Sequence, residues 1–152
     1  MNVEEHQARI SYEESLGETK RLLHEVVDII MKNGIDWSGK IPLANRCNGL
    51  GISGKTGVYK IMDITGDVVY YGEGKIFQRI KVCHDVYLKG GKPSGGNKHC
   101  GAEKMYDENP DICNWFFSYS IQEKQEAKCI EKRLIDQDSP RFNSSSQAGA
   151  NI

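Results

Sequence analysis

Two tyrosines stand at the matching ends of two short segments that are rich in β-branched and aromatic residues. The segments cover residues 57–64 and 68–72, and residues 65–67 (Thr-Gly-Asp) lie between them. Gly-Asp between two such runs is typical of a β-hairpin. Pairing of the two strands would bring the phenol hydroxyls of Tyr59 and Tyr70 into one small region.

Downstream of the hairpin, the chain supplies a guanidinium, a carboxylate and an amide. Arg79 lies in the segment 75–88, which predicts a helix. Glu131 lies in a second predicted helix, residues 122–135, and Asn143 ends the run Pro-Arg-Phe-Asn. In order and approximate spacing, the two tyrosines and these three residues resemble the motif residues of the GIY-YIG nucleases, which cut phosphodiester bonds in nucleic acid.

The resemblance covers more than half of the chain, and it implies a metal-dependent endonuclease that acts on DNA. Tyr59 and Tyr70 match the two motif tyrosines. Arg79 matches the catalytic arginine, Glu131 the metal-binding glutamate, and Asn143 the asparagine near the end of the domain. The implied cofactor is Mg²⁺ or Mn²⁺, and the implied partner is double-stranded DNA. Because duplex cleavage needs two nicks, a homodimer is compatible with this function.

The residue types fit the chemistry of phosphodiester cleavage, which requires water activation and charge neutralisation. Glu131 offers a carboxylate for one hard divalent ion that keeps most of its waters. Arg79 offers a planar fork that matches a phosphate. Tyr70 would orient the water or the phosphate. Tyr59 would accept the proton of the water, although a free phenol with a pKa near 10 is a poor base.

The chain also departs from the family pattern. Glu73 stands directly after the second motif, where family members often carry lysine or serine, and Lys75 is a substitute for that residue. A histidine often lies one helical turn after the arginine, whereas His84 comes five residues after Arg79. His99 begins a segment where some members carry a second histidine. Lys75 and the two histidines are therefore candidates for catalytic support.

The net charge of −1 hides a division of the 152-residue chain into acidic and basic parts. Acidic residues outnumber basic ones in the first 36 residues, whereas cations dominate residues 75–104. Phosphate binding needs local cations rather than a basic total. The nucleic-acid contacts predicted in the basic stretch are Lys81, Lys89, Lys92, Lys98 and Lys104.

The pattern of apolar residues predicts an α+β fold: a small antiparallel three-stranded sheet flanked by helices, as the resemblance also implies. The third strand is expected over residues 114–121, and a short helix over 100–106. An N-terminal helix is predicted to begin at Ser11, which forms a capping-box signature with Glu14. Residues 33–34 (Asn-Gly) are a suitable end for this helix.

The chain is expected to consist of a helical extension with a linker, residues 1–50, and a nuclease-like domain, residues 51–152. No apolar run approaches the roughly 20 residues of a membrane span, and the N-terminus lacks the basic and apolar parts of a signal peptide. Five cysteines, an odd number without framework spacing, indicate reduced thiols in a cytoplasmic protein.

Other functions remain open at this point. Residues 49–56 (GLGISGKT) match the phosphate-binding loop of nucleoside triphosphatases letter for letter. Such a loop needs a buried strand before it and a helix after it, but residues 58–64 predict a strand. A P-loop nucleotide-binding protein is one alternative, and a non-cutting nucleic-acid binding module of the same fold is another. Within the nuclease hypothesis, the sequence does not separate a restriction enzyme, a phage or mobile-element nuclease and a repair nuclease.

A zinc site is disfavoured by the spacing of its candidate ligands. The pairs Cys83-His84 and His99-Cys100 each consist of adjacent residues. Zinc ligands are usually separated by two to four residues, and neighbouring residues on a helix point apart.

Overall fold

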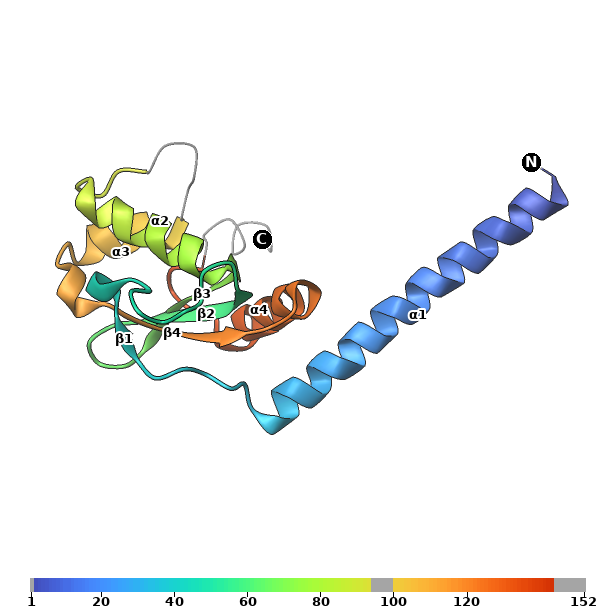
Figure 1. Ribbon diagram of the computed structural model, residues 1–152, viewed down its shortest axis with the longest axis horizontal. Helices are drawn as coiled ribbons and strands as arrows, with labels where there is room; N and C mark the ends of the chain where they lie inside the picture. The colour runs from blue at the N-terminus through green and yellow to red at the C-terminus, as the bar shows by residue number, and fades with distance from the viewer. Residues whose placement is uncertain (1, 94–99, 144–152) are drawn as a thin grey trace. The chain divides into compact units, whose positions relative to one another are not determined.

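The chain divides into two compact units in a computed structural model that describes residues 2–93 and 100–143 (Figure 1). The units are Met1–Ile35 and Asp36–Ile152. The sequence places the boundary at residue 50, about fifteen residues later. The difference arises because the segment after residue 35 belongs to the core of the second unit, where Leu43 and Cys47 are buried.

The first unit is a single long helix, α1 (Val3–Asn33). It begins eight residues before the predicted start at Ser11, because the side chain of Asn2 caps it by accepting a hydrogen bond from the amide of Glu5 at 2.8 Å. The predicted end is confirmed, since Gly34 follows with a φ of 89°. None of the helices in residues 2–93 and 100–143 is both long and apolar enough to cross a membrane.

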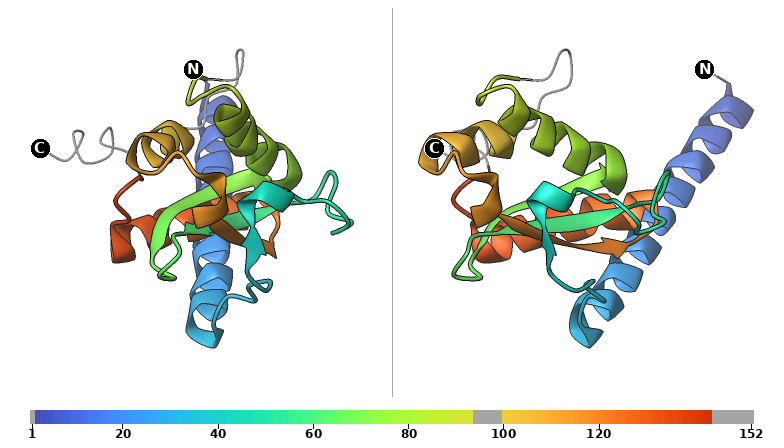
Figure 2. Two further views of the ribbon diagram at one scale, coloured as in Figure 1. Left: turned by 90° about the vertical axis from the view of Figure 1, so that its left-hand side faces the viewer. Right: turned by 60° about the vertical axis from the view of Figure 1, so that its left-hand side comes forward.

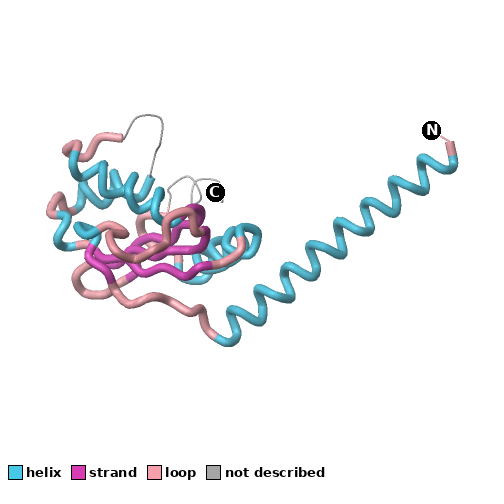
Figure 3. Tube along the Cα trace, viewed as in Figure 1, coloured by secondary structure: helices cyan, strands magenta, loops and turns pink. Residues whose placement is uncertain are grey.

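The second unit contains an antiparallel sheet of four strands, one more than predicted. The strands are β1 (Ile41–Pro42), β2 (Thr56–Met62), β3 (Val68–Lys75) and β4 (Phe116–Ile121), in the order β1-β4-β2-β3. The additional strand, β1, has only two residues, and its proline is compatible with its place at an edge of the sheet. The α+β class is confirmed (Figure 3).

The predicted hairpin is present as β2 and β3, and its turn depends on one carboxylate. The Asp63 side chain accepts hydrogen bonds from the amides of Thr65 at 3.0 Å and Asp67 at 3.1 Å. Such local bonds from aspartate stabilise turns. Because β3 follows β2 through this turn and forms the opposite edge from β1, one side of β3 has no strand neighbour within residues 2–93 and 100–143.

Helices cover both faces of the sheet (Figure 2). The helices α2 (Ile76–Leu88) and α3 (Cys100–Glu108) lie on one face, and α4 (Lys124–Asp138) lies on the other. Two short 3-10 turns, Leu43–Asn45 and Ile112–Asn114, complete the elements of the described residues. The main core lies between the sheet and the first two of these helices and includes Tyr59, Ile61, Phe117, Ile80 and Met105.

The close approach of β2 and β4 gives a first testable prediction. A Cβ atom added to Gly57 would lie 2.0 Å from the backbone oxygen of Ser120, so alanine fits only if the strands separate. Gly57→Ala should therefore lower the free energy of unfolding by about 2–3 kcal/mol. Gly39→Ala is the matched control, because a Cβ there meets nothing within 4 Å. Urea unfolding measures both, and equal stability of the two variants would contradict the packing described.

Candidate active site

The hairpin brings the two motif tyrosines together, as predicted. Tyr59 of β2 faces Gly72 of β3, and Tyr70 faces Ile61. The two tyrosine rings lie 6.1 Å apart between centroids, at 35° to each other. Gly72 makes this packing possible, because a Cβ there would lie 2.2 Å from the Tyr59 ring. On the helical side, a Cβ added to Gly101 of α3 would lie 2.6 Å from the Tyr70 ring, so this glycine makes room for Tyr70.

Arg79 hydrogen-bonds the hydroxyl of Tyr59. The helix α2 follows β3 without a loop, so Arg79 lies one turn into the helix and close to the end of the hairpin. Its aliphatic carbons pack beside Gly74, where an added Cβ would lie 3.5 Å from the arginine Cγ. The φ of Gly74 is 124°, a conformation that favours glycine. The two glycines of β3 thus shape the site around both the tyrosine and the arginine.

The environment of Tyr59 does not suit the role of proton acceptor that the sequence suggests. The residue is 0% exposed. Burial raises its pKa well above the ordinary value, the neighbouring Tyr70 raises it further, and Arg79 lowers it only in part. The phenol is therefore neutral near pH 7. What the geometry supports is a structural task, in which the phenol oxygen accepts a hydrogen bond from the Arg79 guanidinium and holds it in place.

Glu131 of α4 lies within electrostatic reach of the same arginine. Burial raises the pKa of this carboxyl to about 7, the charge of Glu73 raises it as well, and the charge of Arg79 lowers it. Glu131 comes from the helix on the opposite face of the sheet to α2, and both helices pack against the edge strand β3. Arg79 thus interacts with both the buried tyrosine and the glutamate.

Glu73 is a member of this site that the sequence does not assign to it. It lies on β3 directly after Gly72, is half-buried, and acts electrostatically on both Glu131 and Arg79. The sequence shows it only as a departure from the family motif. Its place in the strand could have indicated that it belongs to the site, because residue 73 follows Gly72, the glycine against which Tyr59 packs.

The donor set is compatible with one hydrated divalent ion. Glu131 is a half-buried carboxylate with a raised pKa, because the charge of Arg79 does not compensate for the effect of burial. A divalent cation would supply the missing positive charge, and Mg²⁺ commonly uses one or two carboxylates while keeping several waters. Within residues 2–93 and 100–143, no group of three or more His, Cys, Asp or Glu side chains could enclose a metal. Glu131 is therefore the candidate ligand, with water in the other positions.

Asn143 supports the site from the free edge of β3. Its amide oxygen accepts a hydrogen bond from the backbone amide of Tyr71 at 2.7 Å, and its nitrogen donates to the backbone oxygen of the same residue at 2.8 Å. The amide of Phe142 donates to the oxygen of Val69 at 3.0 Å. The end of the described chain therefore fixes β3 on both sides of Tyr70.

A cluster on the opposite face of β3 has no counterpart among the sequence predictions. The Tyr71 hydroxyl donates to Asp138 at the end of α4, and the Tyr71 ring stacks on Trp37 with centroids 6.4 Å apart. The Lys60 ammonium lies 4.5 Å above the Trp37 ring. These residues are far apart in sequence, and only Tyr71 belongs to a motif, so it is the folded chain that relates them. They hold the strand that carries Tyr70.

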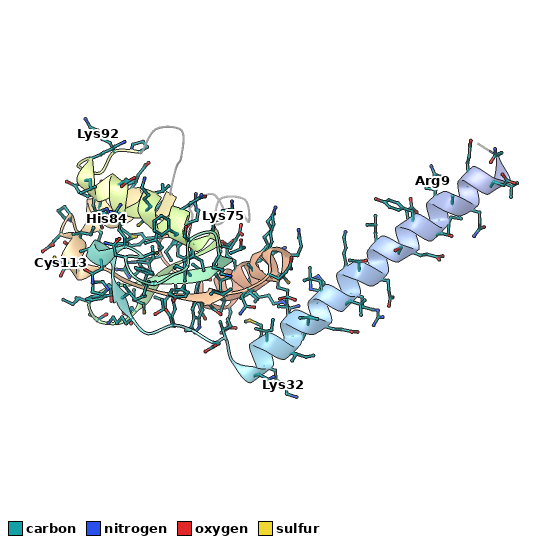
Figure 4. The ribbon with its side chains drawn as sticks, viewed as in Figure 1. Arg9, Lys32, Lys75, His84, Lys92 and Cys113 are labelled. Carbon is teal, nitrogen blue, oxygen red and sulfur yellow. The ribbon has the colours of Figure 1, made fainter. Side chains whose placement is uncertain are left out.

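The three residues predicted to support catalysis do not all lie beside Arg79 and the tyrosines. Lys75 is exposed at the start of α2 (Figure 4). His84 instead hydrogen-bonds the backbone of Ala44, and burial and the charge of Arg46 lower its pKa. The buried Nδ1 of His84 has no hydrogen-bond partner among the described residues. His99, like Lys98, lies outside the described residues.

The position one helical turn after Arg79 belongs to Cys83, not to a histidine. Its thiol is buried, and burial raises its pKa to about 12. A thiol that stays neutral beside Arg79 and Tyr59 fills space and exchanges no proton near pH 7. The one-residue difference between Cys83 and His84 turns the histidine by about 100° around the helix, away from the tyrosines.

The predicted phosphate contacts lie mainly beyond the other end of α2. Lys89 is the residue after this helix, and Lys92 lies further on (Figure 4). At 1.5 Å per residue, a helix of 13 residues separates them from the Arg79 end by about 20 Å. Lys81 forms an ion pair with Asp85 at 3.6 Å, and Lys104 is half-buried on α3. Lys89 and Lys92 therefore lie away from the site, whereas Lys81 is two residues from Arg79 on the same helix.

The segment with the phosphate-loop sequence does not lead into a helix. Residues 49–51 are irregular, a turn follows, and β2 begins at Thr56. A helix N-terminus after the loop is what allows backbone amides to hold nucleotide phosphates. The geometry required of a P-loop is therefore missing from this segment.

No protein-family model and no curated protein matches this chain. Its function is therefore inferred from the site itself.

The raised pKa of Glu131 predicts a stability effect that is independent of activity. The pKa is about 7 in the folded chain, against an ordinary value of 4.5, so the protonated form is favoured by folding. The contribution of protonated Glu131 to the free energy of unfolding is complete below pH 4.5 and is lost as the pH rises through 7. In EDTA at pH 8, Glu131→Gln should therefore raise the free energy of unfolding by about 1–2 kcal/mol, a value reduced for the remaining solvent exposure.

Urea unfolding of the wild type and the variant at pH 4.5 and pH 8 measures this effect. Asp136→Asn is the control, because Asp136 is exposed on the same helix and should give no such gain at pH 8. Mg²⁺ at pH 8 should stabilise the wild type more than Glu131→Gln. A Glu131→Gln variant that is less stable than the wild type at pH 8 without metal would contradict the burial described here.

Proposed function

We propose that the chain is a metal-dependent endonuclease that hydrolyses phosphodiester bonds in DNA, with a domain of the GIY-YIG type. The observation that carries the proposal is the position of Arg79, which hydrogen-bonds the buried Tyr59 and lies within electrostatic reach of Glu131. The three residues come from β2, α2 and α4, in the order that the resemblance implies. A guanidinium and a metal-binding carboxylate around one point suit a phosphate.

Each residue of the site has a defined task in this proposal. Arg79 binds the non-bridging oxygens of the scissile phosphate, and Tyr59 holds the guanidinium in the orientation that this requires. Glu131 would hold Mg²⁺ or Mn²⁺, which supplies positive charge at the phosphate and lowers the pKa of a bound water. Tyr70, half-buried beside Tyr59, orients the phosphate or the attacking water. Asn143 keeps β3 in position through the backbone of Tyr71.

Two observations favour a second function, a nucleic-acid binding module that does not cut. Cys83 occupies the position one turn after Arg79, and Tyr59 is too deeply buried to take a proton from water. Both features remove groups that a hydrolytic site can use for proton transfer. A phosphate-binding site with Arg79 alone would still bind DNA. The two functions differ in whether a strand is broken.

End-labelled duplex DNA distinguishes them. The purified chain is incubated with the duplex in Mg²⁺, in Mn²⁺ or in EDTA, and the products are separated under denaturing conditions. A nuclease gives shorter strands with 5′- or 3′-phosphate ends that require the metal. DNA binding without any shortened strand, with every metal tested, supports the non-cutting module and rejects the nuclease.

A further inference from the structure

Two lysines that are distant in sequence become neighbours at the end of the sheet where the candidate active site lies. Thr56 and Lys75 are the last facing pair of β2 and β3. The amide of Ile76 donates a hydrogen bond to the backbone oxygen of Lys55 at 3.0 Å. Facing Cα atoms of an antiparallel pair are about 5 Å apart, so the backbone of Lys55 runs beside Lys75. Both lysines are exposed.

This pair of lysines lies next to Arg79. Lys75 precedes α2, and Arg79 comes four residues later, about 6 Å along the helix axis at 1.5 Å per residue. One strand of B-DNA advances about 3.4 Å per nucleotide, so this separation corresponds to one or two nucleotides. The first turn of α2 reads Ile-Phe-Gln-Arg, which adds no acid between the lysine and the arginine.

The local charge balance leaves room for an anion. Lys55, Lys75 and Arg79 carry three positive charges, and the acids that act on Arg79 and its surroundings are Glu73 and Glu131. Those two carboxylates interact electrostatically with each other and with the arginine. Lysine ammonium groups on flexible stems suit a phosphate that is bound but not reacting, since they give charge without a fixed fork.

We propose that Lys55 and Lys75 together bind a backbone phosphate of the same DNA strand that Arg79 engages, one or two nucleotides from the scissile phosphate. The proposal rests on the proposed nuclease function and adds Lys55 to the substrate contacts. It also gives a role to Lys55 of the GLGISGKT segment. This segment leads into β2 rather than forming a nucleotide loop, and its lysine lies beside the start of α2.

A free nucleoside triphosphate presents the same phosphate chemistry. The backbone phosphate is favoured because β2, not a helix, follows Lys55, so the row of backbone amides that holds a triphosphate is not formed. The experiment therefore includes one arm for each source. DNA is measured by binding, and ATP by calorimetry on the wild type and on Lys55→Ala.

DNA affinity is measured by fluorescence anisotropy on the full chain, in a Glu131→Gln background so that no strand is cut. Adding Lys55→Ala and Lys75→Ala should weaken binding roughly tenfold or more, and should reduce the slope of log K against log salt by nearly one, since the two lysines share one phosphate. Lys40→Ala is the control. Lys40 is an exposed lysine next to β1, at the opposite edge of the same sheet, and its ammonium lies 4.5 Å from the centroid of the Phe116 ring. This variant should bind as the parent does.

Two outcomes would overturn the proposal. In the first, the lysine variants retain the affinity and the salt slope of the parent; if the wild type still cuts DNA, the nuclease function stands and only the lysine contact is removed. In the second, the wild type binds ATP with micromolar affinity and Lys55→Ala does not, which assigns the lysine to a nucleotide. Weaker DNA binding by the lysine variants, together with a wild type that never cuts, instead rejects the nuclease function and keeps the phosphate contact.

Discussion

Replacing Glu131 by glutamine should abolish metal-dependent cleavage of DNA while the domain stays folded. The substitution preserves the shape of the side chain and removes the charge that would hold the ion, and Glu131 is the ligand of the proposed site. Because burial and Glu73 together raise the pKa of the wild-type carboxyl despite the charge of Arg79, a neutral side chain at this position is compatible with the folded state. Single-turnover cleavage at saturating DNA, with the Mg²⁺ concentration varied, measures the effect.

Asp136→Asn is the matched control for this experiment, since it removes one carboxylate from the exposed side of the same helix. It should cut at the wild-type rate. Metal binding gives a second readout that does not depend on activity: Mn²⁺ should bind the wild type more tightly than Glu131→Gln. Full activity of a folded Glu131→Gln variant would remove this residue from the site.

Arg79→Ala should slow the chemical step by about 10²–10³, which is the usual effect of deleting one preorganised charge donor to a transition state. Arg79 is held by Tyr59 from one side and flanked by Gly74. Such a fixed guanidinium can match developing charge on a phosphate. Arg79→Lys should restore little of the rate, because an ammonium lacks the planar fork. Single-turnover rates at saturating DNA isolate this step from binding.

Lys89→Ala combined with Lys92→Ala gives the contrast to Arg79→Ala. These lysines lie beyond the far end of α2 and should contribute affinity alone. The slope of log K against log salt should fall by nearly one for each DNA phosphate that a lysine no longer neutralises. At saturating DNA, the double variant should keep the wild-type rate. If its rate falls as severely as that of Arg79→Ala, or if Arg79→Ala weakens only affinity, the separation between chemistry and binding is wrong.

The parts of the fold that depend on local signals were predictable from the sequence. The hairpin has a Gly-Asp turn between two β-prone runs, and the helices around Arg79 and Glu131 begin and end within a few residues of their predicted bounds. The predicted start of α1 was wrong, because a capping-box signature at Ser11 competes with a real cap at Asn2. The strand β1 was missed, since two residues contain too little pattern to be recognised.

The sequence proposed several members of the candidate site, but it did not assign Glu73 to the site and did not reveal the environments of the residues. Spacing along the chain places Tyr59, Arg79 and Glu131 in the right order, but burial is a property of the whole fold. The sequence therefore does not reveal that Tyr59 is fully buried or that Glu131 is partly so. The interaction of Glu73 with both Glu131 and Arg79 depends on how β3 lies between α2 and α4, which no local pattern specifies.

The helix phase explains why His84 was misplaced. One residue along a helix turns a side chain by about 100°, so a histidine five residues after Arg79 does not face the tyrosines, whereas Cys83 does. The structure accordingly assigns His84 to the backbone of Ala44 and puts a neutral thiol beside the arginine. A histidine introduced by Cys83→His would be the nearest test of whether that position can serve the reaction.

Cleavage of supercoiled plasmid DNA tests the central claim most directly. The purified wild-type chain is incubated with the plasmid in Mg²⁺ or in EDTA, beside Glu131→Gln and Arg79→Ala at the same concentration. The proposed site predicts conversion of supercoiled DNA to nicked and linear forms by the wild type in Mg²⁺, no conversion in EDTA, and little or none by either variant. Plasmid that stays supercoiled with the wild type in Mg²⁺ and in Mn²⁺, or that is cut equally well by the two variants, would contradict it.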